Sequence, residues 1–181
     1  MTGRISLEIS ELLRDPLTGV VSRGVLEGEI AEFVSMATTE RPAGLIMIDL
    51  DNFGAVNKSQ GYAEGDLLLV RVVERIAASL SPEDVLGRLG GDEFAVIGFR
   101  SDPGKLARQI VENLAEAGIS ASVGIALAPL DAEDPRALKV AADCALRLSK
   151  QTGKGRATGY DNSTRRRVAA GWTPSAANTY G

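Results

Sequence analysis

Two adjacent carboxylates, Asp92 and Glu93, follow a pair of glycines in the segment Gly-Gly-Asp-Glu-Phe at residues 90–94. The runs on either side, residues 84–89 and 93–99, have the composition of strands, so the glycines indicate a tight turn. Adjacent carboxylates at a hairpin tip repel each other, which is a poor choice for stability alone. The pattern favours a site that receives a divalent cation or another positive group.

A second acidic segment, Asp49-Leu50-Asp51, ends the short apolar run of residues 45–48. Such a run is typical of a fully buried strand. If this strand and the strand after the glycine turn are neighbours, Asp49 and Asp92 converge and could share a cation. The alternative is that these carboxylates only solvate turns and cap local backbone.

The composition excludes several kinds of site. The 181 residues include no histidine, which rules out a histidine-based nucleophilic triad or a histidine-ligated zinc site. A net charge of −4 and 4% aromatic residues argue against a nucleic-acid partner. The single cysteine, Cys144, indicates a reducing compartment, and no apolar run reaches the length of a membrane span. We therefore expect a cytoplasmic protein with no membrane partner.

The elements that must position these carboxylates alternate along the chain, which predicts an α/β or α+β fold with one central sheet. We expect residues 1–14 to form an N-terminal linker helix, 15–161 to form one domain, and 162–181 to form a flexible tail. A loop is expected from Asp51 to Gly65. Helices are predicted at 4–14, from Ser22 to a break at Pro42, at 66–80, at 103–117 and from Pro135 to Lys150, and strands at 45–48, 84–89, 93–99, 119–127 and 156–160.

Several separated segments occur in an order that matches one family. They are Asp15-Pro16-Leu17-Thr18-Gly19, Asp49-Leu50-Asp51-Asn52-Phe53 with Asn57, Gly61, Gly65 and Asp66, residues 90–94, Ser122-Val123-Gly124-Ile125-Ala126, and residues 142–150 with Gly153. From about residue 15 to 161 the chain resembles the GGDEF domains, which are diguanylate cyclases. The resemblance implies a single palm-like domain whose central, mostly antiparallel sheet is flanked by helices. It also implies a homodimer in which each domain binds one GTP, and the two GTP molecules become cyclic di-GMP with release of two pyrophosphates.

The resemblance also implies roles at the carboxylates. Asp49 and Asp92 would be metal ligands, with the backbone carbonyl of Leu50 as a further oxygen. Glu93 would activate the attacking hydroxyl or hold a second metal. Oxygen ligands and phosphate chemistry favour Mg²⁺, with Mn²⁺ as the alternative.

The nucleotide contacts follow in the same way. Asn57 and Asp66 would bind the guanine edge, although Asp66 could instead be the N-cap of the helix expected at 66–80. Lys150 would reach the triphosphate, or would only complement a helix C-terminus. The remaining phosphate contacts would be Phe53, Gly54 and Lys154. Independently of the resemblance, we expect Phe94, the last residue of the signature, to be a core residue. Arg88, two residues before the signature, is expected to pair with a carboxylate in the fold or to form part of a dimer face.

Some positions depart from the family pattern. They are Gly54 for a lysine, Lys58 for an aspartate, Tyr62 for a histidine and Lys154 for an arginine. The family's product-inhibition motif, Arg-x-x-Asp, has Ser81 in place of its arginine and retains only Asp84, so no intact inhibitory site is expected. Two hypotheses remain: an active diguanylate cyclase, or a catalytically weak domain that acts as a GTP-binding sensor or protein scaffold. Control would come from an upstream sensor domain or a regulatory protein.

Overall fold

A five-stranded sheet forms the centre of the molecule in a computed structural model that describes residues 13–161 and residue 164. Its strand order is β2-β3-β1-β4-β5, antiparallel throughout except for the parallel pair of β4 and β5. This confirms the predicted α/β fold with a mostly antiparallel sheet flanked by helices. The elements are α2 (Arg23–Met36), β1 (Ala43–Leu50), α3 (Phe53–Gln60), α4 (Tyr62–Ala77), β2 (Val85–Gly90), β3 (Glu93–Phe99), α5 (Pro103–Glu116), β4 (Ala121–Ala128), α6 (Pro135–Gln151) and β5 (Ala157–Gly159).

The central strand β1 is buried along its whole length, and its side chains alternate between two cores. Ile46, Ile48 and Leu50 pack in one core with residues of α4 and α5. Leu45 and Met47 pack in the other with residues of α2 and α6. By the same alternation, the side chain of Asp49, the next odd-numbered residue, lies on the face of the sheet that α6 covers.

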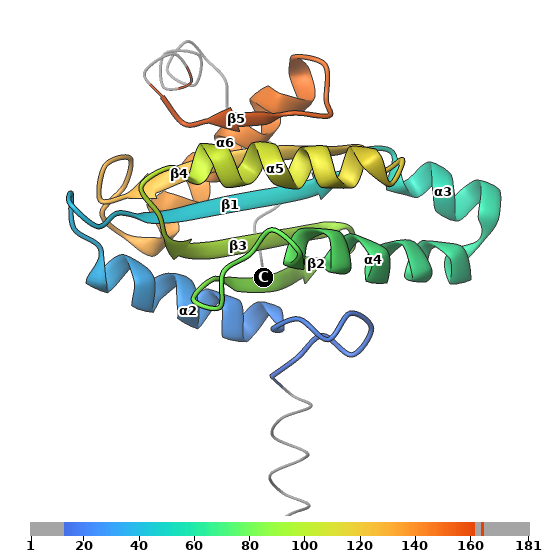
Figure 1. Ribbon diagram of the computed structural model, residues 1–181, viewed down its shortest axis with the longest axis horizontal. Coiled ribbons are helices and arrows are strands. Elements are labelled where there is room, and N and C mark those ends of the chain that lie inside the picture. The colour runs from blue at the N-terminus through green and yellow to red at the C-terminus, as the bar shows by residue number, and fades with distance from the viewer. Residues whose placement is uncertain (1–12, 162–163, 165–181) are drawn as a thin grey trace, which may run out of the picture.

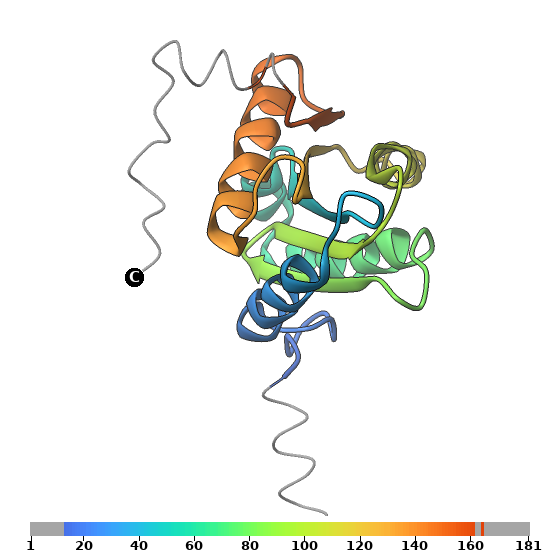
Figure 2. The ribbon, with the colours of Figure 1, turned by 90° about the vertical axis from the view of Figure 1, so that its left-hand side faces the viewer.

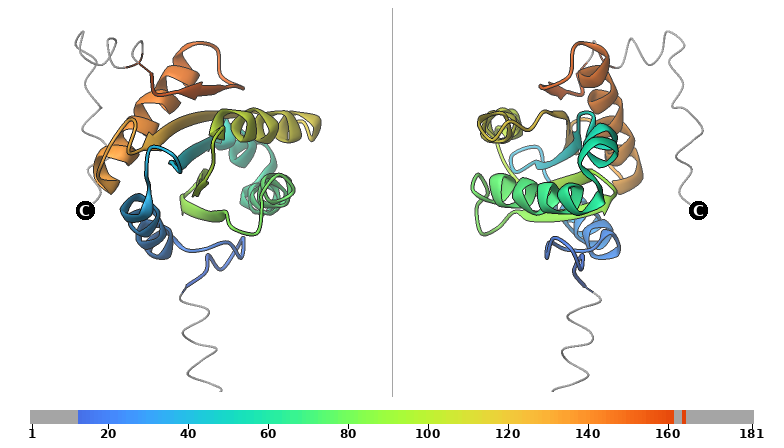
Figure 3. Two further views of the ribbon diagram at one scale, coloured as in Figure 1. Left: turned by 60° about the vertical axis from the view of Figure 1, so that its left-hand side comes forward. Right: turned by 90° about the vertical axis from the view of Figure 1, so that its right-hand side faces the viewer.

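The helices form a layer on each side of the sheet. Figure 2 shows α6 on the opposite side of the sheet from α4 and α5. The helix α3 stands beyond the end of the sheet where β1 finishes (Figure 1), and the right-hand view of Figure 3 looks onto this end. No helix among the described residues is both long and apolar enough to cross a bilayer.

The predicted loop from Asp51 to Gly65 is wrong, because the helix α3 and the first turn of α4 occupy it. No side chain of α3 is fully buried, so the helix lacks the apolar periodicity by which a sequence reveals one. It is held instead by close packing at Gly65, where an added Cβ would overlap Asn57 Oδ1. The interpretation of Asp66 as an N-cap is also wrong, since α4 begins at Tyr62 and Asp66 lies in its second turn.

The other predicted elements are confirmed within four residues at each end, except that α2 ends at Met36, six residues before the break expected at Pro42. The start of α6 follows the expected chemistry, because the Asp134 carboxylate accepts hydrogen bonds from the backbone N–H groups of Arg136 and Ala137. Phe94 is fully buried, as expected of a core residue. The linker helix expected at 4–14 and the tail expected at 162–181 lie outside the described residues, apart from residues 13, 14 and 164.

Candidate active site

The two acidic segments meet where β1 ends. The strands β1 and β3 are antiparallel neighbours, and their register sets Asp49 directly opposite Glu93. The backbone N–H of Leu50 donates to the backbone carbonyl of Asp92 at 3.3 Å, which ties the glycine turn to the end of β1. Directly opposed residues of an antiparallel pair have Cβ atoms about 5 Å apart. Acidic residues 49, 92 and 93 therefore lie together, as the neighbouring-strand hypothesis required.

Lys150 reaches this group from α6, and its Nζ lies 2.6 Å from Asp49 Oδ2. Burial raises the pKa of the Asp49 carboxyl, the bond from Lys150 opposes that rise, and the charges of Asp92 and Asp51 add to it. The pKa of Glu93 is also raised, first by burial and then by the Asp49 charge. Lys150 is thus more than a cation at a helix C-terminus, because it contacts the carboxylate cluster directly.

The donor set suits a magnesium ion that is shared with a substrate. No three acidic side chains of the described residues gather closely enough to enclose an ion by themselves. Mg²⁺ is usually held by one or two carboxylates together with phosphate oxygens and water. Burial is the first cause of the raised pKa of Asp49 and of Glu93, and the repulsion from neighbouring carboxylates that adds to it would be relieved by added positive charge. Asp49, Asp92 and the Leu50 carbonyl fit such an ion, whose remaining ligands would come from a triphosphate.

The helix α3 begins immediately beyond β1 and presents its N-terminus beside the carboxylates. Asn52 is its N-cap residue, in the left-handed conformation with φ of 64°, and its side chain does not cap the helix. The Asn52 amide oxygen instead accepts a hydrogen bond from Lys154 Nζ at 3.0 Å. The first backbone N–H groups of a helix have no intrahelical partner and attract anions. Phe53 and Gly54, the first two residues of α3, therefore stand where a phosphate could bind.

The other end of α3 holds a buried polar atom without a partner. Among residues 13–161 and 164, Asn57 Oδ1 is the one buried side-chain nitrogen or oxygen atom that makes no hydrogen bond. It lies against Gly65, and the exposed residue Asp66 follows in α4. A buried acceptor left unpaired costs about 1–3 kcal/mol, so such an atom indicates a missing donor. The exocyclic amine and ring N–H of guanine are donors of this kind.

Arg88, for which the sequence left two interpretations, pairs with a carboxylate in the fold. Its guanidinium donates to both oxygens of Asp15, at 3.1 and 3.2 Å, and also to the Gly91 carbonyl at 2.7 Å. The side chain therefore connects the opening turn of the domain to the glycine turn of the site. The sequence carried a signal for this link, since Asp15 lies in a turn motif and Arg88 lies two residues before the glycine turn.

Sequence reasoning gave no role to Asp51, although its carboxylate accepts three hydrogen bonds beside the site. The donors are Ser120 Oγ at 2.6 Å, Ser122 Oγ at 2.8 Å and the Gly155 backbone N–H at 2.9 Å. Only the spacing of two serines on alternate residues of a predicted strand hinted at a shared partner. The contact with Gly155 is not visible in the sequence, because 104 residues separate the two positions.

The remnant of the product-inhibition motif is engaged inside the domain. The Asp84 side chain is 2% exposed and forms an ion pair with Arg100. Both the backbone N–H and the hydroxyl of Ser81 donate to the same carboxylate, at 2.7 and 2.9 Å. Asp84 therefore stabilises the turn before β2.

A palm-like sheet with helices on both faces is the fold of solved GGDEF domains, and here a carboxylate cluster lies at the end of its central strand. The chain belongs to the GGDEF domain family: residues 12–156 match the family described as diguanylate cyclase, GGDEF domain. The family resemblance seen in the sequence is thereby confirmed.

Individual relatives agree with this assignment. The chain is 35% identical to the bifunctional diguanylate cyclase/cyclic di-GMP phosphodiesterase MucR of Pseudomonas aeruginosa, over 83% of this chain and 24% of that protein. It is 33% identical to the diguanylate cyclase TpbB of the same species, over 78% of this chain and 36% of TpbB. The solved GGDEF domain of TpbB superposes with a TM-score of 0.79 at 30% identity, covering 86% of this chain and 99% of that domain. The chain thus spans about a quarter to a third of the length of these two curated relatives.

Proposed function

We propose that the chain is a diguanylate cyclase, a nucleotidyltransferase that condenses two GTP molecules into cyclic di-GMP across a homodimer. The observation that carries this proposal is the convergence of Asp49, Glu93 and the Asp92 turn at the end of β1. In the reaction, the 3′-hydroxyl of each GTP attacks the α-phosphorus of the other. Each attack forms one phosphodiester bond, breaks the α–β phosphoanhydride bond, and releases one pyrophosphate and the hydroxyl proton.

The protein's own residues would orient the two ends of each nucleotide. Asn57 and Asp66 bind the guanine edge, and an acidic acceptor there selects guanine because adenine presents no matching donors. The backbone N–H groups of Phe53 and Gly54, together with Lys150 and Lys154, hold the phosphates. Glu93 accepts the proton of the attacking hydroxyl or helps to hold a second metal ion.

Metal dependence is part of the proposal. Asp49, Asp92 and the Leu50 carbonyl would hold Mg²⁺, or alternatively Mn²⁺. When bound, the ion neutralises charge on the phosphates and on the leaving pyrophosphate. Lys150 already contacts Asp49, which supports a site where positive charge and carboxylates balance each other.

The test is formation of cyclic di-GMP from GTP and Mg²⁺, measured at several protein concentrations to reveal dependence on dimer formation. The variant Asp92→Ala should abolish product and retain the fold, as judged by circular dichroism. Its matched control is Asp102→Ala, because Asp102 lies near the opposite end of β1, where it caps α5 and forms an exposed ion pair with Arg108. Product formation by the Asp92→Ala variant would show that the metal-ligand assignment is wrong.

The proposed enzyme lacks high-affinity product inhibition at residues 81–84. Support comes from the burial of the Asp84 carboxylate and from its ion pair with Arg100, which leave it unable to receive a ligand. Calorimetric titration with cyclic di-GMP should show no tight binding that depends on Asp84. Micromolar or tighter binding at this turn would overturn the statement.

A second candidate is a catalytically weak domain that binds GTP or a protein partner. The observations in its favour are Gly54 and the exposed residues Lys58 and Tyr62, each a departure from the family pattern. A relative that is 34% identical, over 78% of this chain and 23% of that protein, is named as the cyclic di-GMP phosphodiesterase PdeR of Escherichia coli. Tight GTP binding without product at any protein concentration would favour this candidate. Under either proposal, the input signal would reach the domain through an upstream sensor domain or another regulatory protein.

A further inference from the structure

Asp51 joins three parts of the chain that lie far apart in sequence. Its Oδ2 accepts from Ser120 Oγ and from the Gly155 backbone N–H, and its Oδ1 accepts from Ser122 Oγ. The backbone adds a fourth link, from the Asp51 N–H to the Ser120 carbonyl at 2.9 Å. One carboxylate thus fastens the end of β1 to the start of β4 and to the loop after α6.

The loop after α6, residues 152–156, is tied to that helix by two bonds: the Lys154 backbone N–H donates to the Ser149 carbonyl at 3.1 Å, and Ser149 Oγ donates to the Arg156 carbonyl at 2.7 Å. Gly153, Lys154 and Gly155 have φ values of 123°, 60° and 55°. A lysine in the left-handed region is disfavoured and persists only where surrounding contacts enforce it. Two such contacts face β1: the bond from the Gly155 N–H to Asp51, and the bond from Lys154 Nζ to Asn52.

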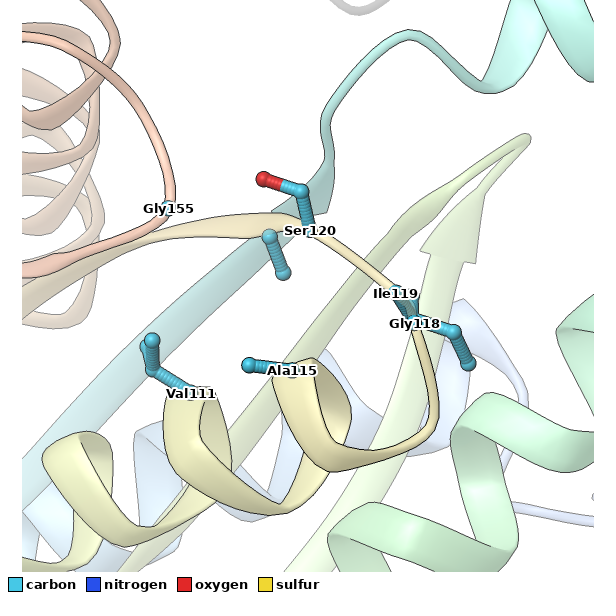
Figure 4. Close-up of a pocket in the computed structure, with 7 residues that line it drawn as sticks. Val111, Ala115, Gly118, Ile119, Ser120 and Gly155 are labelled. Atoms are coloured by element: carbon cyan, nitrogen blue, oxygen red, sulfur yellow. The ribbon is translucent and has the colours of Figure 1, made fainter.

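An open pocket lies on the side of the loop that faces α5. A cavity of about 220 Å³ opens beside Gly155 and is lined by Val111 and Ala115 of α5 and by Ile119 and Ser120. Figure 4 shows Gly155 on the loop alongside Ser120, with Val111 and Ala115 on the far side of the space. On the β1 side, the described hydrogen bonds of the loop are the one from the Gly155 N–H to Asp51 and the one from Lys154 Nζ to Asn52.

We propose that Asp51 is a positioning residue that holds Lys154 over the phosphate-binding N-terminus of α3. The proposal rests on the proposed function, since it gives Lys154 a triphosphate to contact. Asp51 itself does not touch the substrate: its two oxygens are engaged by three donors of the protein. It acts by fixing the loop, and through the loop it fixes the ammonium group that Asn52 already orients.

The chain offers a variant pair that separates geometry from charge. In Asp51→Asn, the amide oxygen can replace Oδ2 and accept from Ser120 and Gly155, while the amide N–H donates to Ser122 Oγ. In Asp51→Ala all of these bonds are lost. Both variants remove the negative charge near Asp49, so a difference between them reports the position of the loop. Asp134→Ala is the control: it also removes a carboxylate that accepts hydrogen bonds, in this case from two backbone N–H groups at the start of α6.

The first measurement is GTP turnover, with KM and kcat determined separately. Asp51→Ala should raise KM for GTP about tenfold, the usual effect of one lost charge-assisted contact, with a smaller change in kcat. Lys154→Ala should raise KM by a similar factor. The KM of the double variant should not exceed the larger of the two single-variant values. Asp51→Asn and Asp134→Ala should stay within about threefold of the parent protein. Additive losses in the double variant, or equal losses in Asp51→Asn and Asp51→Ala, would overturn the proposal.

The second measurement needs no activity. Hydrogen exchange of the Gly155 amide, followed in the nucleotide-free protein, should be faster in Asp51→Ala than in the parent protein and near the parent rate in Asp51→Asn. Equal exchange in all three proteins refutes the positioning role even if the chain makes cyclic di-GMP. Absence of both product and GTP binding in the parent protein refutes the proposed function instead. The two failures are therefore distinguishable.

Discussion

Replacing Asn57 by alanine should make the nucleotide-free protein more stable and its binding of GTP weaker. The reason is the unpaired Oδ1 atom, which is buried without a donor. Removing it relieves a penalty of about 1–3 kcal/mol. Alanine in place of asparagine adds about 0.5 kcal/mol within the helix α3. Lost packing of the amide subtracts about 1 kcal/mol. The net expectation is a gain of about 1 kcal/mol in the free energy of unfolding.

For a domain of this size, that gain raises Tm by about 2–4 °C. The bound state should change in the opposite direction, because guanine loses an acceptor that the fold holds in place. One hydrogen bond is worth about tenfold in affinity here. Thermal denaturation of the nucleotide-free variant and calorimetric titration with GTP measure the two effects independently.

Asn113→Ala is the matched control, since Asn113 also lies within a helix but its amide donates to Ser79 Oγ at 2.7 Å. Removing a satisfied asparagine should lower stability or leave it unchanged, and should not affect GTP binding. A fall in Tm of the Asn57→Ala variant similar to that of the Asn113→Ala variant would refute the reasoning. So would unchanged GTP affinity in the Asn57→Ala variant.

Three further outcomes are expected. Gly65→Ala should destabilise the fold and weaken GTP binding, since its Cβ would overlap Asn57 Oδ1, and denaturation together with titration will check both effects. Burial acts to raise the pKa of Asp15, but bonds from Thr18 and the Arg88 charge outweigh it and lower the pKa. The stability that Asp15 contributes, about 1–3 kcal/mol, is therefore complete above its unfolded pKa and is lost as pH falls through the lower folded value. Urea unfolding should show a deficit of Asp15→Asn at pH ~7 that shrinks towards pH ~3, and a deficit that grows in acid would contradict this sign. Burial raises the pKa of Cys144 to about 11, so at pH ~8 about one thiol in a thousand is ionised, and a disulfide reagent should react at least about 100-fold faster after unfolding in urea.

Much of the fold could be predicted because its apolar patterns are strong. The apolar run at residues 45–48 predicted the buried central strand. The pair Asp134-Pro135 predicted the first residue of α6 correctly. The helix α3 was missed because its eight residues bury no side chain completely, so it carries no apolar stripe. Such a helix is stabilised by what it packs against, and that information is tertiary.

The candidate site shows the same division. The acidic residues were found because their types and their place after strands suggest chemistry, and one strand pairing was enough to bring Asp49 and Glu93 together. The contacts that hold the site together were not found. The ion pair of Lys150 with Asp49 and the bond of Gly155 to Asp51 each join residues about 100 positions apart, and they depend on how α6 crosses the sheet.

This arrangement also bears on the departures from the family pattern. Gly54 removes a lysine side chain, but it leaves the backbone N–H groups at the start of α3 in place. Two other cations, Lys150 and Lys154, come from the end of α6 and the loop after it, and each already contacts the β1–α3 turn, at Asp49 and Asn52. In the proposed cyclase, positive charge for a triphosphate would therefore come from the α6 side of the site. Loss of the contact at residue 54 would cost about 1–3 kcal/mol, which slows a cyclase without changing what it makes.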